Sequence, residues 1–100
     1  MPFKEVVWTA RAFKDLKSIY NLIAKDSLIS AKKVVNSILD REEQLQTQPK
    51  SGTIQTGLKL KKEYRFFVQS HYKIIYREGK TSVYVIKVFD TRQSPKKINK

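Results

Sequence analysis

Basic and aromatic side chains crowd the second half of this 100-residue sequence, and they are the residues best suited to chemistry. The cations are Lys59, Lys61, Lys62, Arg65, Lys73, Arg77, Lys87 and Arg92, and the rings among them are Tyr64, Phe67, Tyr72 and Tyr84. Such a mixture can hold phosphate groups by charge and stack unpaired bases on its rings. The simpler interpretation is that the cations solvate an exposed face while the rings pack the core. Under the first interpretation, Lys59, Lys61, Lys62 and Arg77 are the candidate nucleic-acid-binding residues.

The net charge of +12 supports an anionic partner. Residues 1–50 carry nine basic and six acidic side chains, a net of +3, whereas residues 51–100 carry twelve basic and three acidic ones, a net of +9. A field of that sign attracts nucleic acid, an acidic protein or a phosphate-bearing surface, and it says nothing about the fold.

The sequence lacks the catalytic or ligand residues that several enzyme classes require. The single histidine, His71, allows no histidine pair, and it is interpreted as a solvated loop residue rather than a general base. Carboxylates are scattered, the three glycines are isolated, and cysteine is absent, so we expect no metal, no cofactor and no disulfide. The longest apolar run, residues 83–86, is far too short to cross a bilayer, so we expect no membrane contact. The absence of cysteine, and the carboxylate of Glu5 where a signal peptide needs its apolar stretch, favour a cytoplasmic protein.

The length predicts one domain over residues 1–100, and the hydrophobic periods predict its elements. An amphipathic helix is expected from Thr9, a possible N-cap, through Ile23. A second helical pattern runs from Ala31 through Leu45 and should end near Gln48, because Pro49 follows. Strands are predicted at 3–8, 64–68, 72–77 and 81–89, with a loop at 50–57 and a turn at 78–80.

The order β-α-α-β-β-β predicts an α+β domain, an antiparallel sheet with a helical hairpin packed on one face. Alternation in the middle strand turns Tyr72, Ile74 and Tyr76 toward the helices and Lys73 away from them. The same parity, applied to the preceding strand, places Arg65 beside Lys73 on the uncovered face. The expected result is a basic, open sheet surface, and Arg92 follows the last strand closely enough to reach its edge.

Six stretches together resemble the RelE/ParE superfamily of type II toxin-antitoxin toxins. They are Thr9-Ala10 through Leu16 and Ile19, Ala31 with Val34-Val35 and Ile38-Leu39, Pro49 with Gly52, Tyr64-Arg65, Tyr72–Tyr76, and Val88–Pro95. The resemblance covers nearly the whole chain and agrees with the element order derived from periodicity.

The resemblance implies a growth-inhibiting toxin with one of two targets. RelE-like members cut messenger RNA in the ribosome, and ParE-like members inhibit DNA gyrase. By resemblance, Arg65, Lys73 and Arg92 stand at or near positions of basic active-site residues in the nucleases, where they would neutralise a phosphorane. A lowered pKa, expected for a lysine among like charges, would let Lys73 transfer protons.

Two departures from the nuclease pattern shift the interpretation toward ParE-like members. Thr91 stands where many nucleases have arginine, and residues 98–100 lack the aromatic or histidine that several use. An mRNA interferase and a gyrase-inhibiting non-enzyme both remain open, as does a non-catalytic nucleic-acid-binding or inactive, antitoxin-sequestered module. The family also implies a cognate acidic antitoxin, which we expect to wrap the helical hairpin and the sheet.

Overall fold

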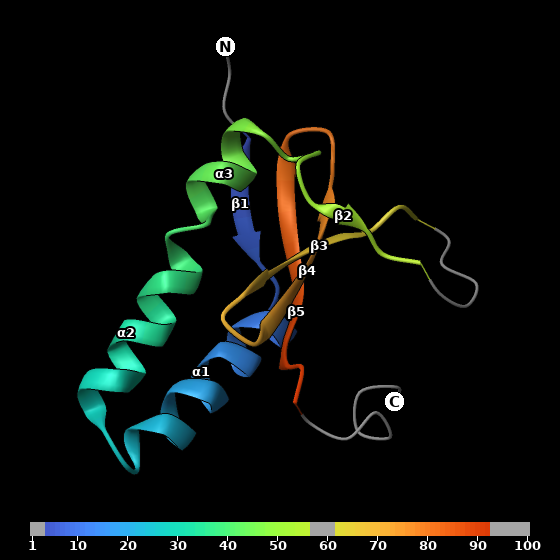
Figure 1. Cartoon of the computed structure of the whole chain (residues 1–100). Coiled ribbons are helices and arrows are strands. Elements are labelled where there is room, and N and C mark those ends of the chain that lie inside the picture. Colours follow the sequence, from blue (N-terminus) through green and yellow to red (C-terminus); the bar gives the residue numbers. More distant parts are fainter. Residues whose placement is uncertain (1–3, 57–61, 93–100) are drawn as a thin grey trace.

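The computed structural model describes residues 4–56 and 62–92. Its elements, in chain order, are β1 (Glu5–Trp8), α1 (Ala10–Ala24), α2 (Leu28–Leu39), α3 (Glu42–Thr47), β2 (Thr53–Ile54), β3 (Arg65–Gln69), β4 (Tyr72–Glu78) and β5 (Ser82–Asp90) (Figure 1). The predicted α+β architecture is confirmed, since α1 and α2 form a hairpin that packs on one face of a five-stranded sheet. No helix in the described ranges has the length and apolarity needed to cross a membrane.

The sheet has the strand order β1-β5-β4-β3-β2 and is mixed rather than antiparallel throughout. The predicted antiparallel pairing holds from β2 to β5, but β1 runs parallel to β5. The helices carry the chain away from β1, and the last strand enters the sheet between β1 and β4. Because β5 is flanked on both sides, its inward residues Val83 and Val85 are completely buried.

Both helices of the hairpin begin at side-chain caps. The Thr9 hydroxyl accepts a hydrogen bond from the N–H of Ala12 at 3.2 Å, which confirms the predicted N-cap, and Ser27 caps α2 in the same way. The prediction of one helix continuing to Gln48 is wrong in one respect, because the chain breaks after Leu39 and resumes as α3. The break turns α3 toward β1 and still buries Leu45, so hydrophobic periodicity alone does not reveal it.

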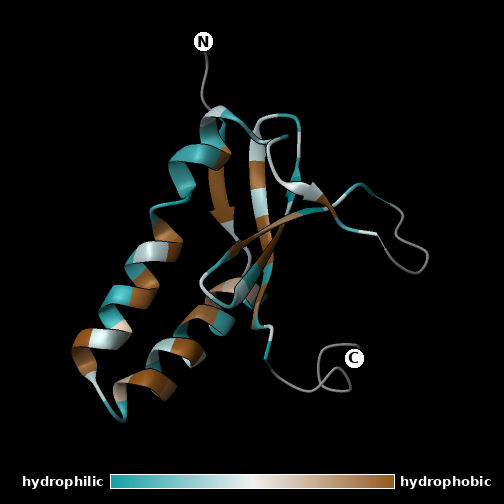
Figure 2. Ribbon diagram, in the orientation of Figure 1, coloured by the Kyte–Doolittle hydropathy of each residue, from teal (hydrophilic) through white to brown (hydrophobic). Residues whose placement is uncertain are grey.

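The core lies between the hairpin and the inner face of the sheet. Its largest fully buried side chains are Tyr76, Ile38, Leu45, Ile74, Val83 and Val85. Tyr72, Ile74 and Tyr76 point inward as predicted, and hydrophobic residues line the central strands (Figure 2).

The polar segment predicted as a loop at 50–57 contains the short strand β2, and it is tied to the core. The buried Tyr76 hydroxyl donates to the carbonyl of Pro49 at 2.8 Å and accepts from the N–H of Gly52 at 2.9 Å. A Cβ on Gly52 would lie 2.3 Å from that hydroxyl, so only glycine fits there without a shift. The segment is therefore anchored where it meets β3.

Candidate functional site

Arg65 lies on the inner face of the sheet, not on the open face where parity placed it. Its cross-strand partner is the buried Tyr76, and directly opposed residues share a face. The Arg65 guanidinium donates to the carbonyl of Gly52 at 2.8 Å and pairs with Glu63 at 2.9 Å, which leaves the side chain 17% exposed. Arg65 therefore fixes the segment that precedes β2.

The turn between β3 and β4 explains this correction. Gln69 pairs with Tyr72, so only Ser70 and His71 form the turn, and Ser70 adopts the positive φ of 56° typical of such tight turns. A two-residue turn pairs odd-numbered positions of β3 with even-numbered positions of β4. Lys73 consequently shares its face with Val68 rather than with Arg65.

Lys73 does lie on the outer face, the side of the sheet turned away from the helices. Its ammonium stands 4.0 Å from the ring centroid of Phe66 and 6.0 Å from that of Phe89. Partial burial lowers the pKa of Lys73, so the predicted direction is confirmed, although the cause is desolvation rather than neighbouring cations.

Arg92 is held by a carboxylate at the end of β5. Its guanidinium meets both carboxylate oxygens of Asp90 at 3.0 and 3.1 Å, and its backbone N–H donates to one of them. This bonding lowers the pKa of Asp90 and raises the pKa of Arg92. Asp90 is paired across the sheet with the inward Tyr72, so the predicted cluster of Arg65, Lys73 and Arg92 on one sheet face is wrong.

The candidate nucleic-acid-binding residues do not all lie on one surface among the described residues. Lys59 and Lys61 lie outside the described residues, and Lys62 is exposed. Arg77 lies on the outer face with its guanidinium 4.8 Å from the ring centroid of Tyr84. The ring of His71 lies against that of Tyr72 in the turn between β3 and β4, and the His71 carbonyl accepts hydrogen bonds from Thr91.

The outer face carries two aromatic rings, Phe66 and Phe89, that were not among the candidate residues chosen from the sequence. Phe67 and Tyr72 point inward, whereas Phe66, Tyr84 and Phe89 alternate with the cations on the outer face. The strand boundaries were close to correct, so the missing information was the register set by the two-residue turn.

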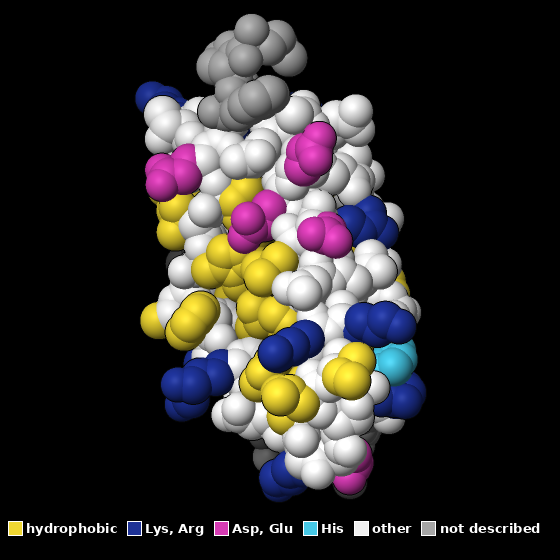
Figure 3. Space-filling model, turned by 90° about the vertical axis from the view of Figure 1, so that its left-hand side faces the viewer, with side chains coloured by type: hydrophobic (Ala, Val, Ile, Leu, Met, Phe, Trp, Pro, Cys, Tyr) yellow, Lys and Arg dark blue, Asp and Glu magenta, His cyan; other side chains and the backbone are white. Residues whose placement is uncertain are grey.

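An apolar groove lies on the opposite side of the molecule, between α1, α2 and β1. It encloses about 510 Å³, and its apolar lining includes Trp8, Phe13, Leu16, Tyr20, Val35 and Leu39. Phe13 remains 60% exposed although it belongs to the periodic apolar positions of α1. Figure 3 shows hydrophobic side chains gathered across this side, with carboxylates above them and cations below.

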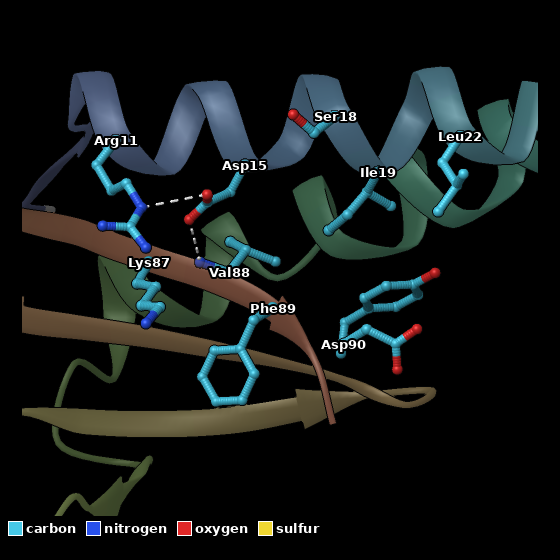
Figure 4. A pocket seen from close by; sticks show the side chains of 10 residues that line it. Arg11, Asp15, Ser18, Ile19, Leu22, Lys87, Val88, Phe89 and Asp90 are labelled. Atoms are coloured by element: carbon cyan, nitrogen blue, oxygen red, sulfur yellow. Dashed lines mark hydrogen bonds and ion pairs between the residues drawn. The ribbon is translucent and has the colours of Figure 1, made fainter. Parts of the chain in front are cut away.

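A smaller cleft separates α1 from the end of β5 (Figure 4). Asp15 accepts a hydrogen bond from the backbone N–H of Val88 at 3.0 Å and pairs with Arg11 at 3.3 Å. The strand β1 ends beside Val85, so Asp15 satisfies a donor on the edge of β5 that β1 leaves unpaired. This carboxylate has a structural role, and no group of three potential metal ligands occurs among the described residues.

Comparison with known proteins adds the family. A family model described as the ParE toxin of type II toxin-antitoxin system, parDE, matches residues 6–95. The chain belongs to the ParE toxin family. This membership confirms the predicted RelE/ParE-type toxin and implies an antitoxin partner.

A solved structure shares the fold of this ParE-family toxin. It is described as the chromosomal ParDE TA system from P. aeruginosa, and it superimposes with a TM-score of 0.74 over 90% of this chain and 98% of that chain. The two sequences are 17% identical, so the likeness concerns the fold. A search of curated proteins found no match.

Proposed function

We propose that this toxin arrests growth by inhibiting DNA gyrase rather than by cutting messenger RNA. The observation that carries the proposal is the separation of the three candidate catalytic cations. Arg65 is tied to Gly52 on the inner face, Lys73 lies over rings on the outer face, and Arg92 is bound by Asp90. A phosphorane needs donors that converge on one group of oxygens, and these three do not converge.

Family membership supports the same choice. The matching family model is that of ParE, and the resemblance associates ParE-like members with gyrase rather than with the ribosome. Thr91 and residues 98–100, which depart from the nuclease pattern, agree with it. Either target would place the protein in the cytoplasm, as its cysteine-free composition predicts.

Induction of the toxin in bacteria tests the proposal. Growth should stop while the 5′ ends of abundant messenger RNAs, mapped by primer extension, stay unchanged. New 5′ ends inside coding regions, lost in the Arg65→Ala, Lys73→Ala and Arg92→Ala triple variant, would overturn the proposal in favour of an mRNA interferase. Continued growth with folded, soluble toxin would support the inactive, antitoxin-sequestered module.

We propose the apolar groove as the binding site of the antitoxin expected for this family. Trp8, Phe13 and Leu39 offer an apolar surface, and Lys17 lies in its wall. An acidic antitoxin segment with apolar side chains on one face would bury those side chains in the groove and place carboxylates near the surrounding cations. Because apolar contacts contribute, binding should persist from ~50 to ~200 mM salt, whereas a purely electrostatic complex would dissociate.

A further inference from the structure

The outer face of the sheet combines cations and rings in one continuous pattern. Val68, Lys73 and Phe89 form one cross-strand row, and Phe66, Ile75 and Lys87 form the next. Arg77 and Tyr84, which are paired between β4 and β5, belong to a third row. Neighbouring strands lie about 4.8 Å apart, so each ring on this face has a cation within reach.

Lys73 and Arg77 differ in their contacts from the ion-paired cations of the described residues. Ion pairs between described residues involve Lys4, Arg11, Lys50, Arg65 and Arg92, each with a carboxylate. Lys73 and Arg77 take part in none of them and lie over aromatic rings instead. The strand registers place one carboxylate on the outer face, that of Glu5 at the start of the edge strand β1. The charge of Lys73 and Arg77 is therefore left for a partner.

The rings indicate which kind of anion fits. Cation–π contacts at exposed sites are weak, so a phosphate can draw the ammonium of Lys73 aside and leave the ring of Phe66 free. Nucleobases stack on such rings, whereas the carboxylates of an acidic peptide gain nothing from them. The middle strand β4 is paired on both sides, so a peptide has no open backbone edge there on which to form an added strand.

We propose that the outer face of the sheet, formed by Phe66, Lys73, Arg77, Tyr84 and Phe89, binds single-stranded nucleic acid. Lys73 and Arg77 would contact phosphates, while unpaired bases stack on Phe66, Tyr84 and Phe89. The preference is for unpaired strands and tolerates any sequence, because every base has a stacking face. This inference goes beyond the proposed function, since it needs neither gyrase nor cleavage of the bound strand.

Fluorescence anisotropy with labelled oligo-dT and the purified chain tests the charge contacts. The Lys73→Ala, Arg77→Ala double variant should weaken binding at least tenfold and should flatten the dependence of log K on log salt by about 1.4, the value for two phosphates on a single strand. The matched control removes the same charge from exposed positions of α2, with Lys32→Ala and Lys33→Ala, and should weaken binding less than twofold. Equal weakening in both variants would overturn the proposal, because net charge alone would then explain binding.

Substitution of rings tests the stacking contacts. Phe89→Leu keeps an apolar side chain but removes a ring of the outer face, and it should weaken oligo-dT binding fivefold or more. Phe67→Leu removes a ring of the inner face and should change binding less than twofold, with circular dichroism confirming that both variants fold. Three results would refute the proposal: equal effects of the two leucine variants, a duplex bound as tightly as oligo-dT, or polyglutamate competing equally well at matched charge. Gyrase is absent from all these assays, so their failure is distinguishable from failure of the proposed function.

Discussion

The Tyr76 hydroxyl anchors the segment that leads into β2, and the change Tyr76→Phe should destabilise the fold strongly. The ring is completely buried, and its hydroxyl serves both the buried N–H of Gly52 and the carbonyl of half-buried Pro49. A buried donor left without a partner costs about 1–3 kcal/mol, and the lost bond to the more accessible Pro49 adds about 0.5–1.5 kcal/mol. We therefore expect the free energy of unfolding to fall by about 1.5–4.5 kcal/mol.

Urea denaturation followed by circular dichroism measures this loss. The denaturation midpoint should fall while the slope m stays unchanged, because the variant alters stability without changing the surface exposed on unfolding. Tyr84→Phe is the matched control, since that hydroxyl has no hydrogen bond in the described part of the chain, and it should shift stability by no more than about 0.5 kcal/mol. Equal, small effects of both substitutions would refute the assigned anchoring role.

Three further tests, with four substitutions, concern the placement of charged and apolar side chains. Arg65→Ala should lower the unfolding free energy by about 1–2 kcal/mol in urea titrations, because it removes a part-buried charged hydrogen bond. Arg92→Ala should leave the urea midpoint unchanged, because its ion pair is exposed. Equal effects of the two substitutions would contradict this contrast. Hydrogen bonds from Lys4 and Lys50 lower the pKa of Glu78, so the stability that this carboxylate contributes above about pH 4.5 should be lost as the pH falls. Glu78→Gln should reduce this loss of stability by up to about 1 kcal/mol, measured by thermal melts at pH 3 and 7. An unchanged pH profile in the variant would contradict this assignment. Phe13→Asp should weaken antitoxin binding at least tenfold by calorimetry without changing the melting temperature, and full affinity would place the antitoxin elsewhere.

The hairpin and the three C-terminal strands could be predicted because their signals are local. Thr9 caps α1 through its own side chain, and alternation in β4 follows from residues within that strand. The parallel pairing of β1 with β5 could not be predicted, since it depends on how residues far apart in the chain meet in the sheet.

The sequence predicted which kinds of residue form the candidate site, but it did not predict on which face of the sheet each of them lies. The sequence identified Lys73 as an outer-face residue correctly, because it follows the alternation within β4. It misplaced Arg65 because the face of one strand relative to the next depends on the length of the connecting turn. With the observed two-residue turn, Phe66 lies on the outer face and Phe67 on the inner face. A turn one residue longer or shorter would reverse these two positions, and so would change which ring faces a ligand on the outer face.

The most direct test of the central claim measures supercoiling of relaxed plasmid by purified gyrase in the presence of purified toxin. Inhibition of gyrase is expected, and it should be relieved when the cognate antitoxin is added. The Arg65→Ala, Lys73→Ala and Arg92→Ala triple variant, if folded, shows whether this inhibition needs those cations. Full supercoiling at all toxin concentrations, with a toxin that still arrests growth and cleaves messenger RNA on translating ribosomes, would contradict the proposed target.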